Sequence, residues 1–396
     1  MIKVCHIITK LELGGAQQNT LSTVQSLDRA QFVPLLITGA AGILIAEANQ
    51  YQHVRKYYLP DLVREIRPMQ DAAALYKIWQ ILRREQHATP HTPLIVHTHS
   101  SKAGILGRWA AKWAGVSWIM HSIHGFGFHP DQSRLARWTF ILLERITSKI
   151  TTHFIAVSQA NIETGMRLGL FSRSRVSLIR SGIDLAHFQK VSARPASEMQ
   201  QQREQKLQEL HIPHHKKVVG IIACFKPQKA PLDFVQAMRL VADAVPEVQA
   251  IMVGDGELRP QIEALIARKH LENVIALLGW RTDIPELLSV CQLLVLTSLW
   301  EGLPRVCPQA MAVGIPIVAT HVDGIPEAVH DGINGFLVQP GDIPKIAEKI
   351  VYLLNNPDLA RNMGEQGQKM VAEFDMQRMV QQQEELYQRL VQKPTR

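Results

Sequence analysis

The feature that most constrains the fold of this chain is a repeated alternation of short apolar segments with amphipathic ones. Residues 2–8, 32–38 and 94–99 are apolar runs of strand length, and each is followed by a segment in which apolar residues recur at helical spacing. Uniformly apolar strands are typical of sheets buried on both faces, and strands that alternate with helices pair in parallel. The pattern therefore predicts an α/β fold with a parallel sheet covered by helices on both faces.

A second series of the same kind begins at Val218, after a polar stretch at 197–209 that has no strand pattern. Its predicted strands are 218–223, 248–254, 274–278, 293–297, 315–320 and 335–338. The chain has 396 residues, whereas single cores stop growing at roughly 250–300 residues. We therefore predict one doubly wound domain at 1–183, a second at 184–375, and a polar helix at 376–396 that returns to the first domain.

Composition and charge narrow the class of protein. Hydrophobic residues make up 46% of the chain and charged residues 20%, as in soluble globular proteins. No apolar run reaches the roughly 20 residues that a membrane span needs. The first residues fit a strand and a turn better than a signal peptide. We expect a cytoplasmic protein, with peripheral attachment to the inner face of the cytoplasmic membrane left open.

The net charge of +8 favours anionic partners such as phosphates or lipid head groups. No aromatic-basic strand motif or helix-turn-helix signature is present, so we expect no nucleic acid as a partner. The four cysteines have neither zinc-ligand nor C-x-x-C spacing, and they read as reduced, buried thiols. His97, His99 and His121 lie at the ends of predicted strands. Buried strand ends more often carry packed, hydrogen-bonded imidazoles than metal ligands, so no metal is predicted.

The strongest local signal is the segment 297–314, TSLWEGLPRVCPQAMAVG. After a predicted strand, Gly302 and Pro304 force a tight loop, and Gly314 suits the C-terminal cap of the helix that follows. This arrangement puts a helix N-terminus at the carboxyl end of a parallel strand, where its N–H groups and dipole favour a pyrophosphate. Glu301 is beside it and can accept hydrogen bonds from sugar hydroxyls.

Further short motifs extend over nearly the whole chain. They are 14–16, 97–104, 121–126, 155–158, 181–184, 227–229, 253–256 and 323–327. Each is weak alone, but their order and spacing resemble the retaining glycosyltransferases of family 4, which carry a Glu-x7-Glu motif. The resemblance implies the GT-B fold, in which two Rossmann-like, doubly wound parallel-sheet domains face a cleft.

The resemblance implies a role for each matching residue. Glu301 would bind hydroxyls of the donor sugar, Lys229 would neutralise the diphosphate, and His124 would lie near the donor sugar or the acceptor. These three are the predicted catalytic residues. The predicted donor-binding residues are Gly14, Gly15, Lys226, Gly254, Arg281, Gly302, Leu303, Pro304, Gln309 and Glu327.

The sequence departs from the family pattern at three positions. The second Glu of the motif is Gln309, which has one acceptor oxygen in place of a carboxylate. The phosphate-binding Arg of the family, five positions before Lys229, is Cys224. Lys226 would replace it if the preceding strand continued that far, because its side chain would then share a face with Cys224. Ser181 stands where the family has Asn.

The function that the resemblance implies is transfer of a sugar, with retention, from a nucleotide-diphosphate sugar such as a UDP-sugar. The acceptor would be lipid-linked or a polysaccharide, in cell-envelope, exopolysaccharide or lipopolysaccharide assembly. No Asp-x-Asp is present to hold a metal, so Lys229 and the helix dipole would stabilise the leaving group without any cofactor. Acceptor contacts are expected from 51–68 and 126–135. The alternatives are a nucleotide-sugar 2-epimerase of the same fold and a non-catalytic partner of another transferase.

The segment 134–149 is predicted to be a basic helix. At about 100° per residue, one sector contains Arg134, Arg137, Trp138, Ile141, Arg145 and Lys149. The opposite sector contains Leu135, Thr139, Leu142, Leu143 and Ile146. Two interpretations follow: a solvated basic face over a helix packed through its apolar side, or a contact with anionic lipid that places Trp138 at the interface.

Overall fold

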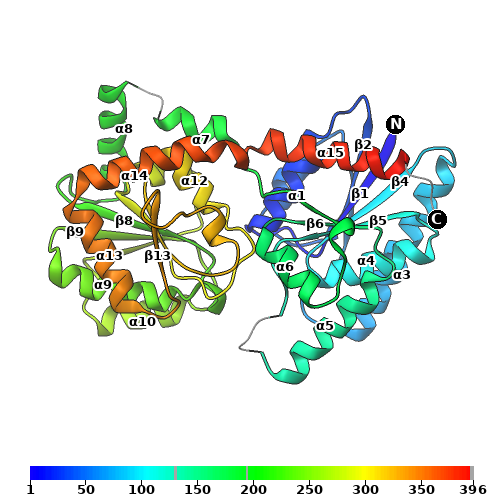
Figure 1. Cartoon of the computed structure of the whole chain (residues 1–396), viewed down its shortest axis with the longest axis horizontal. Helices are drawn as coiled ribbons and strands as arrows, with labels where there is room; N and C mark the ends of the chain where they lie inside the picture. Colours follow the sequence, from blue (N-terminus) through cyan, green and yellow to red (C-terminus); the bar gives the residue numbers. More distant parts are fainter. Residues whose placement is uncertain (129–131, 193–194, 393–396) are drawn as a thin grey trace. The chain divides into compact units, whose positions relative to one another are not determined.

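The computed structural model describes residues 1–128, 132–192 and 195–392 and divides the chain into two compact units (Figure 1). The first unit comprises Met1–Gly182 and Met376–Arg396, and the second comprises Ile183–Asp375. The division thus falls after Gly182, one residue before the boundary drawn from composition. None of the helices within the described residues is long and apolar enough to cross a membrane.

The first unit is built on a seven-stranded parallel sheet with the order β3-β2-β1-β4-β5-β6-β7. Its strands are β1 (Ile2–Ile8), β2 (Phe32–Gly39), β3 (Arg55–Leu59), β4 (Leu94–His99), β5 (Trp118–Ile123), β6 (His153–Ala156) and β7 (Val176–Leu178). The chain steps outward from β1 to β3 and then returns to the other side of β1 at β4. The strand order therefore reverses between β1 and β4, which is where open α/β sheets bind ligands.

Helices cover both faces of this sheet because its central strands are buried on both faces, including polar residues such as Lys3, His6 and His97. One face packs against α3 (Pro68–Ala88) and α4 (Ser101–Trp113). The other face packs against α1 (Gly15–Ser26), α2 (Ile45–Gln50) and the C-terminal helix α15 (Met376–Gln392). Met379, Leu386 and Leu390 of α15 are buried beside strand residues such as Val4 and Ile95. The remaining elements are α5 (Arg134–Ser148), α6 (Gln159–Arg167) and the short helix η1 (Arg173–Arg175).

The second unit repeats the design with a six-stranded parallel sheet of order β10-β9-β8-β11-β12-β13. Its strands are β8 (Lys217–Ile222), β9 (Val248–Val253), β10 (Ile275–Gly279), β11 (Leu293–Leu296), β12 (Ile317–Thr320) and β13 (Gly335–Val338). Here the chain steps from β8 to β10 and then returns to β11 on the other side of β8. The switch point of this sheet therefore lies between β8 and β11.

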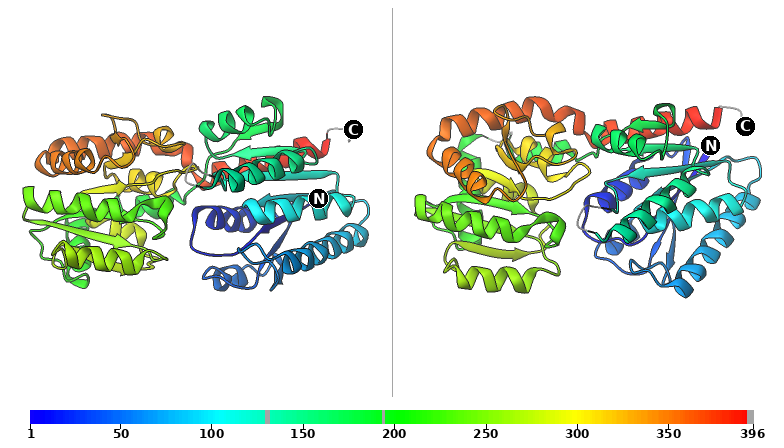
Figure 2. Two further views of the ribbon diagram at one scale, coloured as in Figure 1. Left: turned by 90° about the horizontal axis from the view of Figure 1, so that it is seen from below. Right: turned by 60° about the horizontal axis from the view of Figure 1, so that its bottom comes forward.

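The second unit also has helices on both faces of its sheet (Figure 2). One face packs against α9 (Pro231–Ala244), α10 (Arg259–Arg268) and α13 (Ile343–Asn355). The other packs against α8 (Ala196–Glu209) and α11 (Ile284–Val290). The remaining elements are α7 (Leu185–Ser192), α12 (Val306–Val313), α14 (Pro357–Met370), η2 (Pro227–Lys229), η3 (Ile325–Glu327) and η4 (Val371–Phe374). The predicted class, two doubly wound parallel-sheet domains, is confirmed.

Helix α5 differs from one of its two predicted arrangements. The side chains expected to pack beneath a basic face are themselves exposed, with Leu135 at 74%, Leu143 at 41% and Ile146 at 43%. The helix is held instead by a narrow polar side, where Glu144 pairs with the fully buried Arg108 of α4 at 2.7 Å. The interpretation of a helix packed through Leu135, Leu142 and Ile146 is therefore wrong, because those residues face outward beside the basic ones.

Candidate active site

Lys229 and Glu301 come together at the switch point of the second sheet. Lys229 ends η2, which follows β8, and Glu301 follows β11, the strand hydrogen-bonded to β8. The ammonium group of Lys229 forms an ion pair with Glu301 Oε1, and the hydroxyl of Ser298 donates to the same oxygen at 2.7 Å. Glu301 is only 6% exposed, so these two partners lie beside a carboxylate that is largely shielded from solvent. The structure thus brings together two of the three predicted catalytic residues.

Hydrogen bonds from neighbouring segments fix the loop that carries Glu301. The hydroxyl of Thr297 lies 2.8 Å from the carbonyl oxygen of Lys229 and 2.9 Å from that of Ala230, which ties the end of β11 to the end of η2. Gln228 holds the loop at two points: its carbonyl accepts from Leu299 N–H at 2.8 Å, and its side-chain amide donates to Trp300 O at 2.9 Å. The positions of Lys229 and Glu301 are therefore set by backbone anchors and do not depend on their own ion pair.

A small cavity of about 20 Å³ lies at this ion pair, lined by residues that include Lys229, Ser298, Glu301 and Val306. Val306 is the first residue of α12, so the helix N-terminus borders the same space as the two charges. A volume of this size holds about one water molecule and no hexose. A sugar hydroxyl that reached Glu301 Oε1 would compete for that oxygen with the ammonium group of Lys229.

The other predicted residues of the Glu301 loop are close by in the chain and differ in exposure. Gly302, Leu303 and Pro304 are buried, and α12 begins at Val306, two residues after Pro304. Gln309 lies half-buried in the first turns of α12.

Two further predicted donor-binding residues lie on loops at the same edge of the sheet. Glu327 lies half-buried in η3, after β12. Gly254 follows β9 with φ +130°, and a Cβ atom there would lie 1.9 Å from Ala223 O, so only glycine fits. Its loop closes against the loop that follows β8.

Lys226 and Arg281, two more predicted donor-binding residues, lie in loops of the second unit. Strand β8 ends at Ile222, so the strand alternation that would align Lys226 with Cys224 does not extend that far, and Lys226 lies in a loop. Arg281 is bound by Asp283 through two hydrogen bonds and by Glu209 through a third. The Arg281 guanidinium holds the pKa of Asp283 far below its usual range. A nucleotide base bound beside Arg281 would therefore contact a guanidinium that is already hydrogen-bonded to two carboxylates.

In the first unit, Gly14 and Gly15 precede and open α1 directly after β1. Gly14 has an extended backbone with φ −161°, which any residue adopts. Its conformation therefore gives no separate reason for glycine. His124 follows β5, and its Nε2 atom is hydrogen-bonded to His99 Nδ1 at 3.0 Å. The third predicted catalytic residue thus belongs to a cluster of imidazoles.

This histidine cluster, His6, His97, His99 and His124, lies at the carboxyl ends of β1, β4 and β5, and its extent was missed by sequence reasoning. His99 bonds to His6 Nδ1 at 3.0 Å through its other ring nitrogen. His97 is held by the hydroxyl of Tyr387 in α15 and by that of Ser122, each at 2.7 Å. Tyr387 is 290 positions from His97 in the sequence. The apolar pattern of the C-terminal helix was the one sequence signal that this helix packs on the first unit.

Burial opposes a positive charge on three of these imidazoles, those of His6, His97 and His99. It lowers the pKa of His6 to about 3 and that of His97 and His99 well below the usual value, with neighbouring histidines adding to the shift for the latter two. His121, beside the cluster, has its pKa lowered in the same way by burial and by the charge of Arg108. A positive charge on any of them would have to be desolvated.

Three of these histidines are close enough together to be considered as metal ligands. Ring nitrogens of His6, His97 and His99 lie within 4.8 Å of one another, which is close enough for a shared ion. However, both nitrogens of His97 and both of His99 already make hydrogen bonds. Of the ring nitrogens of these three described residues, His6 Nε2 is the one with no hydrogen-bond partner. The donor set therefore fits a hydrogen-bonded core better than a metal site.

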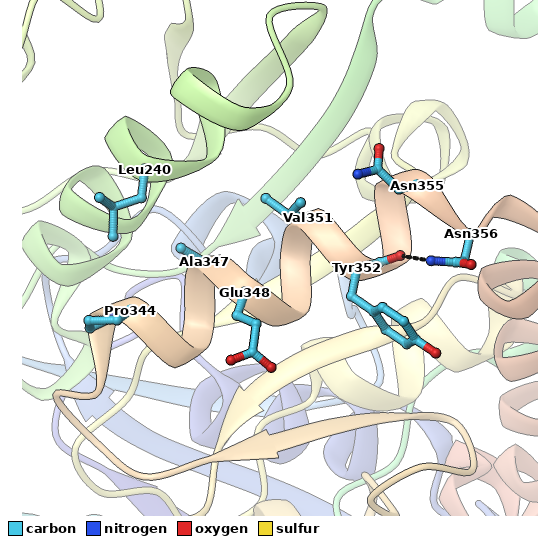
Figure 3. Close-up of a pocket in the computed structure, with 8 residues that line it drawn as sticks. All are labelled: Leu240, Pro344, Ala347, Glu348, Val351, Tyr352, Asn355 and Asn356. Carbon is cyan, nitrogen blue, oxygen red and sulfur yellow. Dashed lines mark hydrogen bonds between the residues drawn. The ribbon is translucent and has the colours of Figure 1, made fainter.

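A second, wider pocket lies elsewhere in the second unit, between α9 and α13 (Figure 3). It has a volume of about 480 Å³ and is lined by Leu240, Pro344, Ala347, Glu348, Val351, Tyr352, Asn355 and Asn356. Its single charged lining residue is Glu348, an anion, whereas a diphosphate requires cations. This pocket shares no residue with the Lys229–Glu301 cavity and is unsuited to a nucleotide diphosphate.

The fold and this site define a class: two doubly wound units, with a Lys–Glu pair at the switch point of the second, are those of a GT-B glycosyltransferase. Residues 13–187 match the family model described as Glycosyltransferase Family 4, and residues 202–370 match the model described as Glycosyl transferases group 1. The chain belongs to glycosyltransferase family 4.

Two relatives whose names state an activity cover nearly all and three quarters of the chain, respectively. UDP-Gal:alpha-D-GlcNAc-diphosphoundecaprenol alpha-1,3-galactosyltransferase of Escherichia coli is 30% identical over 98% of this chain and 96% of its own length. N,N'-diacetylbacillosaminyl-diphospho-undecaprenol alpha-1,3-N-acetylgalactosaminyltransferase of Campylobacter jejuni is 27% identical over 75% of this chain and 77% of its own. The crystal structure of HepE from Anabaena with UDP and glucose matches the fold with a TM-score of 0.82, at 22% identity over 98% of this chain and 100% of that one.

Proposed function

We propose that this glycosyltransferase moves a hexose from a UDP-sugar to a lipid-linked glycan with retention of configuration and without a metal. The observation that carries the proposal is the Lys229–Glu301 pair at the switch point of the second sheet, beside the N-terminus of α12. A cation and a carboxylate held side by side suit the two halves of a sugar diphosphate. The diphosphate would take Lys229, and the hexose hydroxyls would take Glu301.

In the proposed reaction, donor binding replaces the ion pair between Lys229 and Glu301 with two contacts, one from Lys229 to the diphosphate and one from Glu301 to the hexose. Lys229 leaves Glu301 and neutralises the diphosphate, so the departing charge is stabilised electrostatically. The bond between the anomeric carbon and the phosphate oxygen breaks, and a bond to the acceptor oxygen forms on the same face. The acceptor's proton passes to the leaving phosphate, so no protein base is needed for this step. His124 and the Gly14–Gly15 turn keep their predicted roles near the acceptor and the phosphates.

A screen of nucleotide sugars by calorimetry tests this proposal most directly. We expect one UDP-hexose to bind in the micromolar range and UDP to bind without added metal. Its hydrolysis or transfer should be lost in Glu301→Ala, which separates an enzyme from a non-catalytic partner. Release of an epimerised sugar nucleotide in the absence of acceptor would instead favour the 2-epimerase alternative.

The lipid-linked acceptor is proposed from two observations. The printed names of the Escherichia coli and Campylobacter jejuni relatives specify diphospho-undecaprenol acceptors. Helix α5 presents an apolar stripe with Trp138 at 61% exposure and Leu135 at 74%, flanked by basic residues. Glu144 is turned toward Arg108. Basic and apolar stripes side by side are typical of helices that lie in a membrane interface. We therefore propose a cytoplasmic enzyme held at the inner face of the membrane, where such acceptors are found.

Replacing Trp138 with Glu is expected to reduce binding to anionic vesicles about tenfold or more, because it removes an interfacial aromatic and adds a repelled charge. Co-sedimentation with phosphatidylglycerol vesicles measures the change. Tyr352→Glu is the matched control, since Tyr352 is a 46% exposed aromatic residue of the second unit. Equal binding to phosphatidylglycerol and phosphatidylcholine, unaffected by Trp138→Glu, would contradict the proposed membrane contact.

Within the segment 126–135, which is expected to contact the acceptor, residues 129–131 lie outside the described part of the chain.

Restoring the carboxylate at Gln309 is expected to strengthen nucleotide binding. A carboxylate accepts from both ribose hydroxyls, whereas the amide of Gln309 offers one acceptor oxygen. One added hydrogen bond to a charged group is worth about 1.5 kcal/mol, so Gln309→Glu should lower the Kd for UDP by roughly tenfold. Titration calorimetry with UDP checks this. No gain in affinity for UDP, with an unchanged melting temperature, would show that residue 309 does not reach the ribose.

A further inference from the structure

The peptide group between Trp300 and Glu301 is held from both sides. Its carbonyl accepts from the side-chain amide of Gln228 at 2.9 Å. Its N–H group donates to the carboxylate of Asp323 at 2.7 Å. Because this peptide plane sets the direction in which the Glu301 side chain leaves the backbone, the two contacts together orient the carboxylate that meets Lys229.

Asp323 keeps this contact in an unfavourable backbone conformation. It lies in the loop between β12 and η3 with φ +41°, in the left-handed region that glycine adopts most readily. A non-glycine residue persists there only when the surrounding structure compensates for the strain. Here the compensating contact is the hydrogen bond to Glu301 N–H. Glycine at this position would relax the backbone but would leave that N–H group without its acceptor.

We infer that Asp323 is a positioning residue for recognition of the donor hexose, acting through the peptide group of Glu301. This inference rests on the proposed function, because it assigns Glu301 to the sugar and Lys229 to the diphosphate. The inference therefore predicts different effects on the binding of the hexose and of the nucleotide. Loss of the Asp323 carboxylate should weaken binding of the hexose and leave binding of the nucleotide unchanged, because Lys229 is held by Thr297 and not by Asp323.

The test compares Asp323→Ala, Asp323→Gly and Asp323→Asn by calorimetry with UDP, UDP-glucose and UDP-galactose as probes. Asp323→Ala and Asp323→Gly should bind the preferred UDP-hexose about tenfold more weakly, as expected for one lost hydrogen bond at a charged group. Their affinity for UDP should stay within about twofold of wild type. Asp323→Asn keeps an acceptor oxygen and tolerates the left-handed region, so its hexose affinity should fall less than about threefold.

A second readout separates positioning from folding. Asp323→Gly should melt at a higher temperature than Asp323→Ala while binding the sugar equally poorly, because glycine removes the backbone strain and not the functional loss. Asp331→Ala is the matched control: Asp331 also accepts a backbone N–H, from Leu337 at 2.9 Å, in the loop between β12 and β13. It should leave hexose affinity unchanged.

Three results would overturn the inference. The first is unchanged hexose affinity in Asp323→Ala, the second is an equal loss of UDP affinity, and the third is the same loss in Asp331→Ala. Each of these leaves the proposed function standing, provided that the wild-type protein binds UDP and a UDP-hexose. If the wild-type protein bound neither, the proposed function would fail and the inference would fail with it.

Discussion

Replacing Glu301 with Ala is expected to lower kcat/KM for the donor by about a hundredfold to a thousandfold. The carboxylate is 6% exposed and has two fixed partners, so no other group can take over its hydrogen bonds to the hexose. Loss of a preorganised charged contact in such a site costs about 3–4 kcal/mol of transition-state stabilisation. UDP should bind at least as tightly as to the wild type, because Lys229 no longer has a competing partner. Steady-state kinetics and UDP titration measure the two effects separately.

The matched control for this variant is Glu348→Ala. Glu348 is also a glutamate paired with a lysine, Lys345 at 2.8 Å, but it lies on α13 beside the pocket of Figure 3. An exposed pair of this kind contributes little to stability, so we expect wild-type kinetics. Activity of Glu301→Ala within about threefold of wild type would place the donor sugar elsewhere in the molecule.

The fold could be predicted because its signal is repeated and local. The central strands are mainly apolar, as in 2–8 and 218–223, and each is followed by a helical pattern, so both parallel sheets follow from segment order. The pairing of Lys229 with Glu301 could also be anticipated. Each follows a strand at its carboxyl end, and parallel strands bring those ends to one edge of the sheet.

What could not be predicted depends on contacts between distant segments. The hydrogen bond between His97 and Tyr387 joins positions 290 apart, and no local pattern marks it. The hydrogen bond from Arg281 to Glu209 likewise joins segments that are far apart in the sequence. The side of α5 that packs against the unit was also not predicted. The sequence pattern favours its apolar residues as the buried side, whereas polar contacts such as Glu144–Arg108 hold the helix. Arg108 of α4 is buried beneath α5, with its guanidinium hydrogen-bonded to Gly104 and Glu144. Charged residues are mostly exposed, so helical periodicity could not predict this burial.

Lowering the pH from 7.5 to 5.5 is expected to destabilise the first unit by roughly 5 kcal/mol. Four of its buried histidines, His6, His97, His99 and His121, have lowered pKa values in the folded state because burial opposes their charge. The unfolded chain takes up protons near pH 6.5, whereas the folded chain does not until far lower pH. Their contribution is therefore complete above pH 6.5 and is lost as the pH falls below it, at about 1.4 kcal/mol per histidine for each pH unit.

The second unit serves as the control within the same molecule. All of its histidines are exposed: His187, His211, His214, His215, His270, His321 and His330. Hydrogen exchange read by mass spectrometry should therefore show faster opening at pH 5.5 in peptides from β1 and β4 and little change in those from β8 and β11. Replacing His6 with Leu should reduce the pH effect by about a quarter, since it removes one of four such groups. The strands of the first unit can respond in this way only if its imidazoles stay neutral when folded, so equal acid sensitivity in both units would mean that the cluster takes up protons in the native state.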